Sequence, residues 1–533
     1  MTQPTRGRRG MAVAPHALAS QSALAVLREG GNAVEAMVAA AATIAVAYPH
    51  MNGIGGDSFW LIGLPGGAGT EVIGIDACGA SAASADIAQY AGQRAIAFRG
   101  PGAALTVAGT LSGWAQALEI SRTRLAGRMP LTRLLADAID GAAYGVPVTR
   151  SQQRNTESKR AELAGVSGFA EAFMPGGAVP AAGSLFRQPR LAATFEQLAR
   201  AGLDDFYRGD LARSLARDLA QAGSVLTLGD LQCHQALLRT PLQLAHRAGT
   251  VYNMPPPTQG LVSLIILGLM DRLGVERFDH LGADYVHAAA ESVKQAFAVR
   301  DRCITDPACM TVDPASFLTP QALDDMAARI DMGRAAPWGQ GKGPADTIWM
   351  GVIDGQGNAV SMIQSIYHEF GSGIVLAESG VNWQNRGASF SLDPAHINVL
   401  APGKKPFHTL NPALALLHDG RSMVYGNMGG DGQPQTQSAV FTRTVVHGMD
   451  PQAAIEAPRW LLGRTWGQSS DTLKLEGRFP AQTVRALTER GHPVEVLADF
   501  DETFGHAGCI VREASGSLSG GFDPRSDGGV AAF

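Results

Sequence analysis

The sequence predicts an α+β protein built as one body: the order of its patterns indicates the class, and two further observations indicate a single body. Helical spacing of apolar residues predominates through residue 302, whereas short strands separated by turns predominate from residue 347 onward. No Pro/Ser-rich linker or charge run divides the 533 residues. With 45% hydrophobic and 17% charged residues, the chain can bury a large core. We therefore expect one large body of two interlocked lobes.

The first elements are two helices and a strand. Residues 17–29 have helical apolar spacing that stops at Gly30-Gly31, and residues 33–48 are nearly all small and apolar. The second of these helices should therefore be buried against a sheet. A glycine-dense turn, residues 49–57, then leads into a strand at 58–62. The turn lacks the GxGxxG order and a following helix, which favours a structural turn over a phosphate-binding loop.

The middle of the chain is rich in helices. We predict them at 129–144, 190–202, 208–222, 228–234, 260–273 and 283–302. A strand at 250–254 precedes Pro255 to Pro257, which impose an extended segment. Residues 331–346 are rich in Gly, Pro and Ala and predict a flexible loop, which is what a cleavable junction needs.

The last third predicts short antiparallel strands. Strands at 347–353 and 358–366 flank the turn at 354–357, and further strands follow at 412–418, 421–426 and 507–512. Their spacing indicates an antiparallel meander, with helices at 433–447 and 480–491 covering it.

Charge and hydropathy exclude several classes of partner. The formal net charge of −5 gives no field that favours nucleic acid or an anionic membrane. Arg6, Arg8 and Arg9 form the one basic cluster and, without aromatic neighbours, predict a solvated tail. The apolar run at 36–48 is too short to span a bilayer, and the N-terminal residues lack a secretory pattern. We expect a cytoplasmic protein.

The cysteines predict neither disulfides nor a metal site. There are five, without CxxC spacing, at Cys78, Cys233, Cys303, Cys309 and Cys509. Cys303 and Cys309 with His280 and His287 fit no zinc pattern. We therefore expect reduced thiols and no metal, and we also expect no organic cofactor.

Thr347 is the residue with the most informative chemistry. A threonine hydroxyl hardly ionises at neutral pH, so an internal threonine is a poor nucleophile. If the chain is cut before Thr347, the new α-amino group, with a pKa near 8, can accept the hydroxyl proton. One residue would then carry both a nucleophile and its base.

Several motifs in this order resemble those of one family. They are residues 29–36, the 53–56 turn, 254–257, 346–360, 370–374, 378–380, 429–430 and 522–529. On these the chain resembles the γ-glutamyltransferase family of N-terminal nucleophile hydrolases over nearly its whole length. The resemblance implies a four-layer αββα sandwich of two stacked antiparallel sheets. It also implies a precursor that cuts itself into residues 1–346 and 347–533, which remain together as one intertwined body; a homodimer stays open.

The resemblance also implies roles for individual residues. Thr347 is the nucleophile, whose hydroxyl in the precursor attacks the Asp346 carbonyl to give an ester that water opens. Ser365 occupies the position of a hydroxyl that hydrogen-bonds the new amino group. Gly429 and Gly430 match the backbone N–H pair that stabilises the oxyanion, a role that suits glycine because the backbone must approach closely.

The chain departs from the family pattern at the substrate clamps. The arginine that holds the α-carboxylate of glutamate is replaced by Cys78, and the acid that holds the α-amino group by Ser389. Each charge-assisted hydrogen bond contributes about 1.5 to 3 kcal/mol, so a γ-glutamyl head group should bind poorly. A usual pair of hydroxyls is replaced by His408 and Thr409, a polar amide by Tyr367, and the threonine after the nucleophile by Ile348.

The altered pocket favours a smaller acyl amide. The expected substrate-binding residues are Tyr367, Asn385, His408, Thr409, Arg386 and Arg99. The pattern is most similar to the oxamate amidohydrolase branch, which converts oxamate to oxalate and ammonia in purine-nitrogen use. A γ-glutamyl transferase or hydrolase, or a glutaryl-type (cephalosporin) acylase, is the alternative among enzymes. A relative that is not processed and acts in binding is the alternative from another class.

Overall fold

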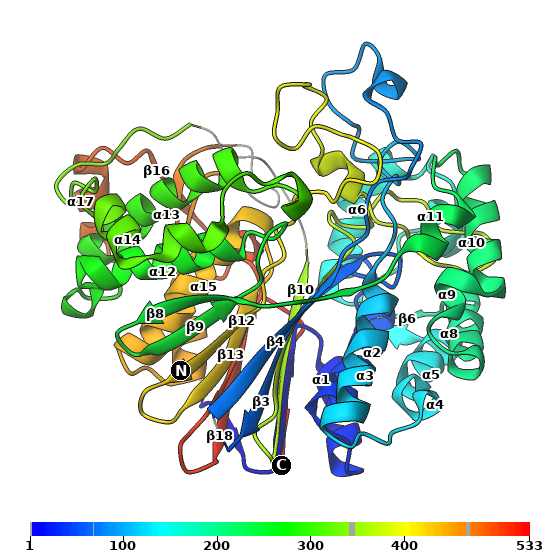
Figure 1. The fold of residues 1–533 in the computed structure, drawn as a ribbon, viewed down its shortest axis with the longest axis horizontal. Coiled ribbons are helices and arrows are strands. Elements are labelled where there is room, and N and C mark those ends of the chain that lie inside the picture. The colour runs from blue at the N-terminus through cyan, green and yellow to red at the C-terminus, as the bar shows by residue number, and fades with distance from the viewer. Residues whose placement is uncertain (1–2, 68, 340–346, 465–469) are drawn as a thin grey trace.

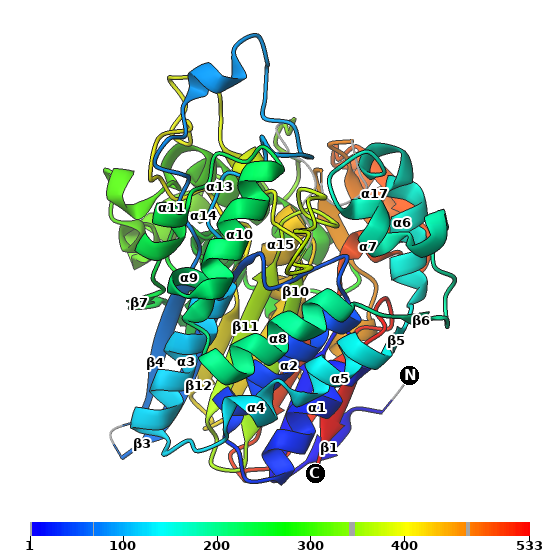
Figure 2. The same cartoon turned by 90° about the vertical axis from the view of Figure 1, so that its right-hand side faces the viewer.

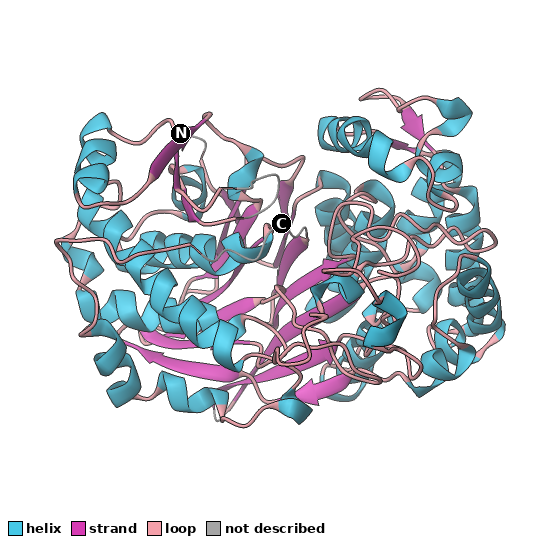
Figure 3. Ribbon diagram, turned by 90° about the horizontal axis from the view of Figure 1, so that it is seen from above, coloured by secondary structure: helices cyan, strands magenta, loops and turns pink. Residues whose placement is uncertain are grey.

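The computed structural model describes residues 3–67, 69–339, 347–464 and 470–533. Two seven-stranded sheets lie face to face between two layers of helices (Figure 1). Seen from above, the strands form the middle of the molecule and helices flank them on both sides (Figure 3). The predicted α+β class and the αββα arrangement are confirmed.

The first sheet carries the hairpin that follows Thr347. Its strand order is β19-β2-β10-β11-β3-β4-β7, and all neighbours are antiparallel. The strands are β2 Gly10–Ala14, β3 Asp57–Gly66, β4 Gly69–Ala77, β7 Leu237–Arg239, β10 Ile348–Asp354, β11 Ala359–Ser365 and β19 Gly529–Ala532. Every residue of β10 and β11 is buried, because both faces of the sheet are covered.

The second sheet is antiparallel as well. Its order is β1-β18-β17-β13-β12-β9-β8. The strands are β1 Thr5–Gly7, β8 Leu242–His246, β9 Gly249–Asn253, β12 Ala413–Leu417, β13 Ser422–Asn427, β17 Ala507–Arg512 and β18 Leu518–Phe522. At one edge, β8 alternates buried and exposed residues, which is the pattern of a strand with one face to solvent.

A compact apolar core joins the two sheets. Phe59 and Ile363 from the first sheet pack with Val424 and Ile510 from the second. The indole of Trp349 lies so close to the second sheet that a Cβ on Gly426 would come within 2.1 Å of its Cδ1. Glycine at that position lets the sheets approach around a large side chain.

Helices of the N-terminal part cover the outer face of the first sheet (Figure 2). These are α1 Ala17–Arg28, α2 Ala33–Ala47, α3 Thr110–Arg124, α4 Leu131–Leu134, α5 Ala136–Tyr144 and α8 Pro189–Ala201. Every residue of α2 is buried, as its small apolar sequence predicts. Asn32 and Glu35 form a capping box that starts α2.

A second group of helices covers the other sheet. α12 Gly260–Leu273, α15 Gln433–Phe441 and α16 Pro451–Glu456 contact its strands. α13 Ala283–Cys303 and α14 Pro320–Ala327 pack on α12, and α17 Ala481–Glu489 packs on α13. The predicted helices at 260–273 and 283–302 are thus present.

Smaller elements surround this body. The helices are α6 Arg150–Leu163, α7 Phe169–Phe173, α9 Asp205–Arg208, α10 Asp210–Gln221 and α11 Leu228–Cys233. Two minor sheets contain β5 Val146–Pro147 with β6 Leu185–Phe186, and β14 Trp460–Leu462 with β15 Leu473–Glu476 and β16 Val494–Leu497.

All five cysteines are free thiols, as expected. Within the described residues, no helix has the length and apolar character needed to cross a bilayer.

The prediction of a single meander is wrong. β10 and β11 belong to the first sheet, whereas β12, β13 and β17 belong to the second. Local spacing predicts strands and turns, but it does not determine to which sheet a hairpin belongs. That choice depends on contacts distant in sequence, such as the pairing of β11 with β3 and of β12 with β9.

Some predicted helices have different limits. Residues 129–144 form two helices, α4 and α5, and residues 208–222 are divided by Gly209, whose extended backbone (φ −99°, ψ −153°) separates α9 from α10. The helices α3, α6, α7, α14 and α16 were not predicted. α17, expected to cover the strands of the meander, packs instead on α13 and β16. Of the predicted loop 331–346, residues 331–339 contain no helix or strand, and 340–346 lie outside the described residues.

Candidate active site

Thr347 lies buried at the start of the central hairpin. It is 0% exposed and directly precedes β10. The antiparallel register pairs Ile348 with Gln364, so the next pair along brings Thr347 opposite Ser365. Asp346, the other half of the predicted cleavage site, lies outside the described residues.

Ser365 ends β11 and is held from two sides. Its Oγ accepts a hydrogen bond from the Tyr367 backbone N–H at 2.8 Å, and its strand partner in β3 is Asp57. The turn before β3 presses against it, because a Cβ on Gly56 would lie 2.0 Å from the Ser365 carbonyl oxygen. The 53–56 turn therefore packs as a structural turn against the end of β11.

Gly429 and Gly430 form a left-handed turn between β13 and α15. Their φ angles are +113° and +50°, a conformation that favours glycine. The Gly430 carbonyl accepts a hydrogen bond of 2.8 Å from Nε2 of Gln259, which also donates to the Thr409 carbonyl at 2.8 Å. Gln259 thus fixes this turn relative to residues 408–409, and a role of the two N–H groups in binding an oxyanion stays a prediction.

Arg386 is a buried cation next to the hairpin. Its side chain is about as deeply buried as the apolar core, with 1% exposure, and its guanidinium carbon lies 3.8 Å from the centre of the Tyr367 ring. The Asn385 N–H donates to the Ile366 carbonyl at 3.2 Å, which brings this segment beside the end of β11. Within the described residues, Nε and Nη1 of Arg386 have no hydrogen-bond partner.

Burial has an electrostatic consequence for this arginine. It lowers the pKa of Arg386 to about 10, so the group is still charged at neutral pH. Tyr367 adopts a φ of +82°, which an L-residue rarely does and which marks the tight turn that places its ring under the guanidinium. A buried, charged group with free N–H donors is suited to bind an anion.

Asn385 and Arg99 are already engaged by protein partners. Asn385 accepts a hydrogen bond from the His368 N–H at 3.0 Å and donates to the Phe98 carbonyl at 2.9 Å. Arg99 donates from Nη1 to the carbonyls of Glu369 and Gly371, at 2.6 and 2.5 Å, and from Nε to a Glu162 carboxylate oxygen at 2.7 Å. These contacts fasten the loop that follows β11.

Asp57 is a site residue that the sequence analysis missed. It is fully buried, and its Oδ1 accepts hydrogen bonds from Gly79 N–H at 3.1 Å and Gly109 N–H at 3.0 Å. Its Oδ2 lies 3.3 Å from Nε2 of His408. Burial raises the pKa of Asp57 to about 7 and lowers that of His408 well below its usual range. The one signal in the sequence was an acid at the end of a glycine-dense turn that opens a buried strand.

Comparison with known proteins identifies the family of this arrangement. The profile of the family described as gamma-glutamyltranspeptidase matches residues 19–533. The chain belongs to the γ-glutamyltranspeptidase family. It is an enzyme that hydrolyses amide bonds on an N-terminal nucleophile hydrolase fold.

Individual relatives agree with this assignment. The chain is 60% identical to the oxamate amidohydrolase proenzyme of Klebsiella pneumoniae subsp. pneumoniae over 98% of each chain. It is 39% identical to the glutathione hydrolase-like YwrD proenzyme of Bacillus subtilis over 100% of each. Among solved structures, a cephalosporin acylase from Bacillus halodurans superposes with a TM-score of 0.90 at 32% identity, covering 100% of this chain and 97% of that one.

Neutral residues occupy the two positions at which charged residues of the γ-glutamyltranspeptidase family are expected to hold glutamate. Cys78 is fully buried, its thiol donates to Oδ1 of Asp76 at 3.1 Å, and burial raises its pKa well above the usual range. Ser389 donates its hydroxyl to the Arg386 carbonyl at 2.9 Å. Arg386, which interacts electrostatically with Cys78 and Asp57, places a positive charge near the position where the family arginine is missing.

The remaining predicted pocket residue is Thr409. It is 5% exposed, and its carbonyl accepts a hydrogen bond of 2.8 Å from the side-chain amide of Asn411. Its hydroxyl oxygen is buried and has no hydrogen-bond partner among the described residues. Together with the neighbouring His408, it presents polar groups on the segment that Gln259 connects by hydrogen bonds to the Gly429–Gly430 turn.

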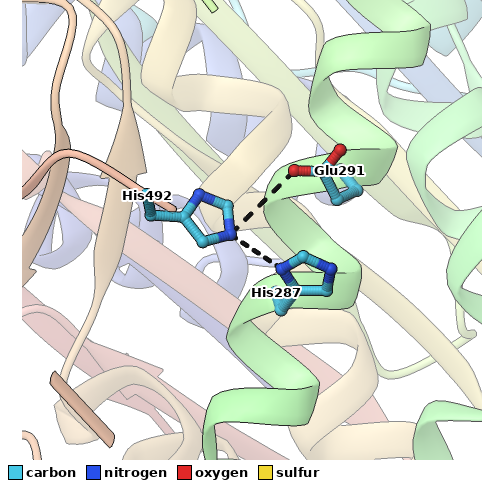
Figure 4. A group of neighbouring side chains, drawn as sticks. All are labelled: His287, Glu291 and His492. Atoms are coloured by element: carbon cyan, nitrogen blue, oxygen red, sulfur yellow. Dashed lines mark hydrogen bonds and ion pairs between the residues drawn. The ribbon is translucent and has the colours of Figure 1, made fainter. Parts of the chain in front are cut away.

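A separate buried cluster has the residue types of a metal site (Figure 4). His287 and Glu291 lie one turn apart on α13 and approach His492; of the four residues weighed in the sequence for zinc, His287 is the one that belongs to it. Nδ1 of His287 and Nε2 of His492 share a hydrogen bond of 2.8 Å, while Lys294 donates to Glu291 at 2.6 Å. An ammonium group bound to the carboxylate opposes a second cation. We therefore interpret the cluster as a hydrogen-bond network.

Proposed function

We propose that this protein is an autoprocessed amidohydrolase whose Thr347, freed by cleavage of the Asp346–Thr347 bond, converts oxamate to oxalate and ammonia. The observation that carries the proposal is the buried, unsatisfied guanidinium of Arg386 beside the end of β11. Oxamate is a small anion whose carboxylate is bonded directly to the amide carbon. An enzyme for it needs one positive charge close to the nucleophile and little further space.

Arg386 supplies that charge from a different segment than the family arginine does. The carboxylate of oxamate accepts hydrogen bonds from Nε and Nη1, which otherwise have no partner within the described part of the chain. In a buried site, such a charge-assisted contact contributes about 1.5 to 3 kcal/mol. The position at which the family holds the α-amino group of a γ-glutamyl substrate has no acid, because Ser389 is neutral and its hydroxyl is hydrogen-bonded to the Arg386 carbonyl.

The reaction then proceeds through an ester. The α-amino group of Thr347 takes the hydroxyl proton while Oγ attacks the amide carbon, and the backbone N–H groups of Gly429 and Gly430 stabilise the negative oxygen. The C–N bond breaks and ammonia leaves with that proton. Water, deprotonated by the same amine, opens the ester and releases oxalate.

Both sheets are built from the two predicted fragments, which supports maturation without dissociation. In the first sheet β10 and β11 lie between β2 and β3, and in the second β12 pairs with β9. Cleavage before Thr347 therefore leaves residues 1–346 and 347–533 joined by backbone ladders across both sheets. The cut exposes a new amine without separating the fragments.

The rival enzymes and the non-catalytic alternative are distinguishable by one set of measurements. Mass spectrometry of the purified protein should give two chains, one beginning at Thr347. Release of the leaving amine should then be measured for each substrate: ammonia from oxamate, cysteinylglycine from glutathione, and the amine from a glutaryl amide. We expect oxamate to be the best substrate by kcat/KM by about 100-fold or more, since both glutamate clamps are missing. A preference for the glutaryl or γ-glutamyl compound would favour the acylase or transferase, and a single uncut chain would favour a binding protein.

A further inference from the structure

A large cavity lies away from Thr347. It has a volume of about 920 Å³ and is open to solvent on one side. Its walls come from the turn between β1 and β2, the end of α1 and the start of α2, the segment after α3, the turn between β10 and β11, the end of β17 with the turn after it, and Phe533. β10 has seven residues, so the cavity lies about 20 Å along the hairpin from Thr347.

Five arginines from four separate segments line this cavity. They are Arg8, Arg9, Arg28, Arg128 and Arg512. None of them has an ion pair or a side-chain hydrogen bond with another described residue. The sequence alone predicts a solvated tail for Arg8 and Arg9, but the fold brings them to the same cavity as three distant arginines.

Two of these charges share one aromatic ring. The guanidinium carbons of Arg9 and Arg28 lie 4.7 and 5.5 Å from the centre of the Phe533 ring. Each is attracted by the ring, and two cations that share one ring also repel one another. An anion bound beside them would reduce that repulsion.

The acids of the cavity do not neutralise the arginines, because other groups already engage them. Both oxygens of Glu29 bind Arg133, each at 2.6 Å. Glu35 accepts hydrogen bonds from the backbone N–H groups of Asn32 and Met129.

Asp354 is engaged in the same way. Its Oδ2 accepts from Ala33 N–H at 3.0 Å, and its Oδ1 accepts from the N–H groups of Gln356 and Asn358, each at 3.0 Å. The cavity therefore presents five cations and three carboxylates that already have partners.

From this arrangement we infer that the cavity is a binding site for a small molecule with several linked phosphate groups, either a free oligophosphate or one carried on a nucleoside. Guanidinium groups bind phosphate oxygens through paired N–H donors, and several that converge favour a ligand with more than one phosphate. The volume lies within the usual range for small-molecule sites of about 300 to 1,000 Å³. The recessed shape favours a small ligand over an extended polymer.

The test is calorimetric titration of the mature protein with inorganic triphosphate, adenosine triphosphate and orthophosphate. We expect both triphosphates to bind one per chain, orthophosphate to bind at least about tenfold more weakly, and the affinity to fall as salt rises above about 0.1 M. Equal affinities of the two triphosphates would identify the free oligophosphate as sufficient, and tighter binding of the nucleotide would identify the nucleoside as part of the ligand. Failure of both triphosphates to bind overturns the inference.

Variants locate the binding to the cavity. Arg9→Gln and Arg128→Gln remove exposed side chains that have no ion pair or side-chain hydrogen bond among the described residues, so the fold should be retained, and each should weaken triphosphate binding by about tenfold. Arg485→Gln on α17 is the matched control, because Arg485 is also exposed but lies outside the cavity. Equal loss in all three variants, or loss in none, would mean that triphosphate binds elsewhere and would refute the site. Oxamate turnover of Arg9→Gln should equal that of the wild type, which separates this inference from the proposed function.

Discussion

The two ends of the β10–β11 hairpin present positive charge in opposite ways. At the Thr347 end, one arginine, Arg386, is 1% exposed and interacts with an aromatic ring. At the turn end, several arginines line an open cavity in contact with water. Burial makes a single charge strong and selective, because little solvent screens it, whereas exposed charges act collectively and are weakened by salt. Changes at the first end should therefore affect chemistry, and changes at the second should affect binding or stability.

The largest expected effect concerns Thr347 itself. Thr347→Ala removes the hydroxyl that both reactions of the proposal require, so self-cleavage and ammonia release should both be lost. Denaturing gels and an ammonia assay measure the two. Thr347→Ser, which keeps a hydroxyl, is the matched control and should retain cleavage and part of the turnover. Full turnover by the alanine variant would rule out Thr347 as the nucleophile.

The second prediction tests the buried charge. Arg386→Gln should lower kcat/KM for oxamate by about 100-fold, which corresponds to the loss of one or two charge-assisted hydrogen bonds of about 1.5 to 3 kcal/mol. Pyruvamide, in which an acetyl group replaces the carboxylate, is the neutral comparison substrate. The ratio of kcat/KM for oxamate to that for pyruvamide should collapse in the variant. An unchanged ratio would show that Arg386 does not bind the carboxylate.

The sequence predicted the backbone of the hairpin better than the contacts of the side chains around it. Strands, turn and the pairing of Thr347 with Ser365 follow from local patterns and the family motifs. Arg386 was weighed as one of two arginines. The sequence offered no way to see that Arg99 would be engaged by backbone carbonyls, while Nε and Nη1 of the buried Arg386 would have no hydrogen-bond partner among the described residues. Such differences depend on which loops meet in three dimensions.

Asp57 shows the same limit more strongly. Its position opposite Ser365 and its contact with His408 join residues far apart in the sequence. Its place after a glycine-dense turn does not report how deeply this particular carboxylate is buried. The division of the last third between two sheets was missed for the same reason, because long-range strand pairing carries no local signal.

The third prediction uses the pKa of Asp57. Because burial raises it from 3.8 to about 7, Asp57 is uncharged in mildly acidic solution and becomes negative as the pH rises through about 7. The new charge interacts with Arg386 and competes with an anionic substrate, so KM for oxamate should rise across that range. Asp57→Asn should flatten this rise in KM, whereas the kcat profile, governed by the Thr347 amine, should remain. A KM profile that is the same in both proteins would contradict the assignment.

The same group predicts a pH dependence of stability. Its pKa is higher in the folded than in the unfolded chain, so its favourable contribution is complete below about pH 4 and is lost as the pH rises through about 7. Urea unfolding of wild type and Asp57→Asn at several pH values measures this as a difference between the two curves. If the difference in unfolding free energy does not change between pH 4 and 8, the raised pKa is wrong.

The smallest expected effect lies at the turn end of the hairpin. Gly357 has a φ of +86°, and a Cβ there would meet Nε of Arg512 at 3.1 Å, a side chain that can move. Gly357→Ala should therefore destabilise the protein by about 1 to 2 kcal/mol through backbone strain, measured by urea unfolding. The kcat/KM of the folded enzyme should be unchanged, because the strain lies at the opposite end of β10 from Thr347. Gly56→Ala is the contrasting variant, since its Cβ meets the Ser365 backbone at 2.0 Å and must displace a group of the site. If Gly357→Ala reduced turnover as much as Gly56→Ala, the two ends of the hairpin would be coupled and the division between chemistry and stability would fail.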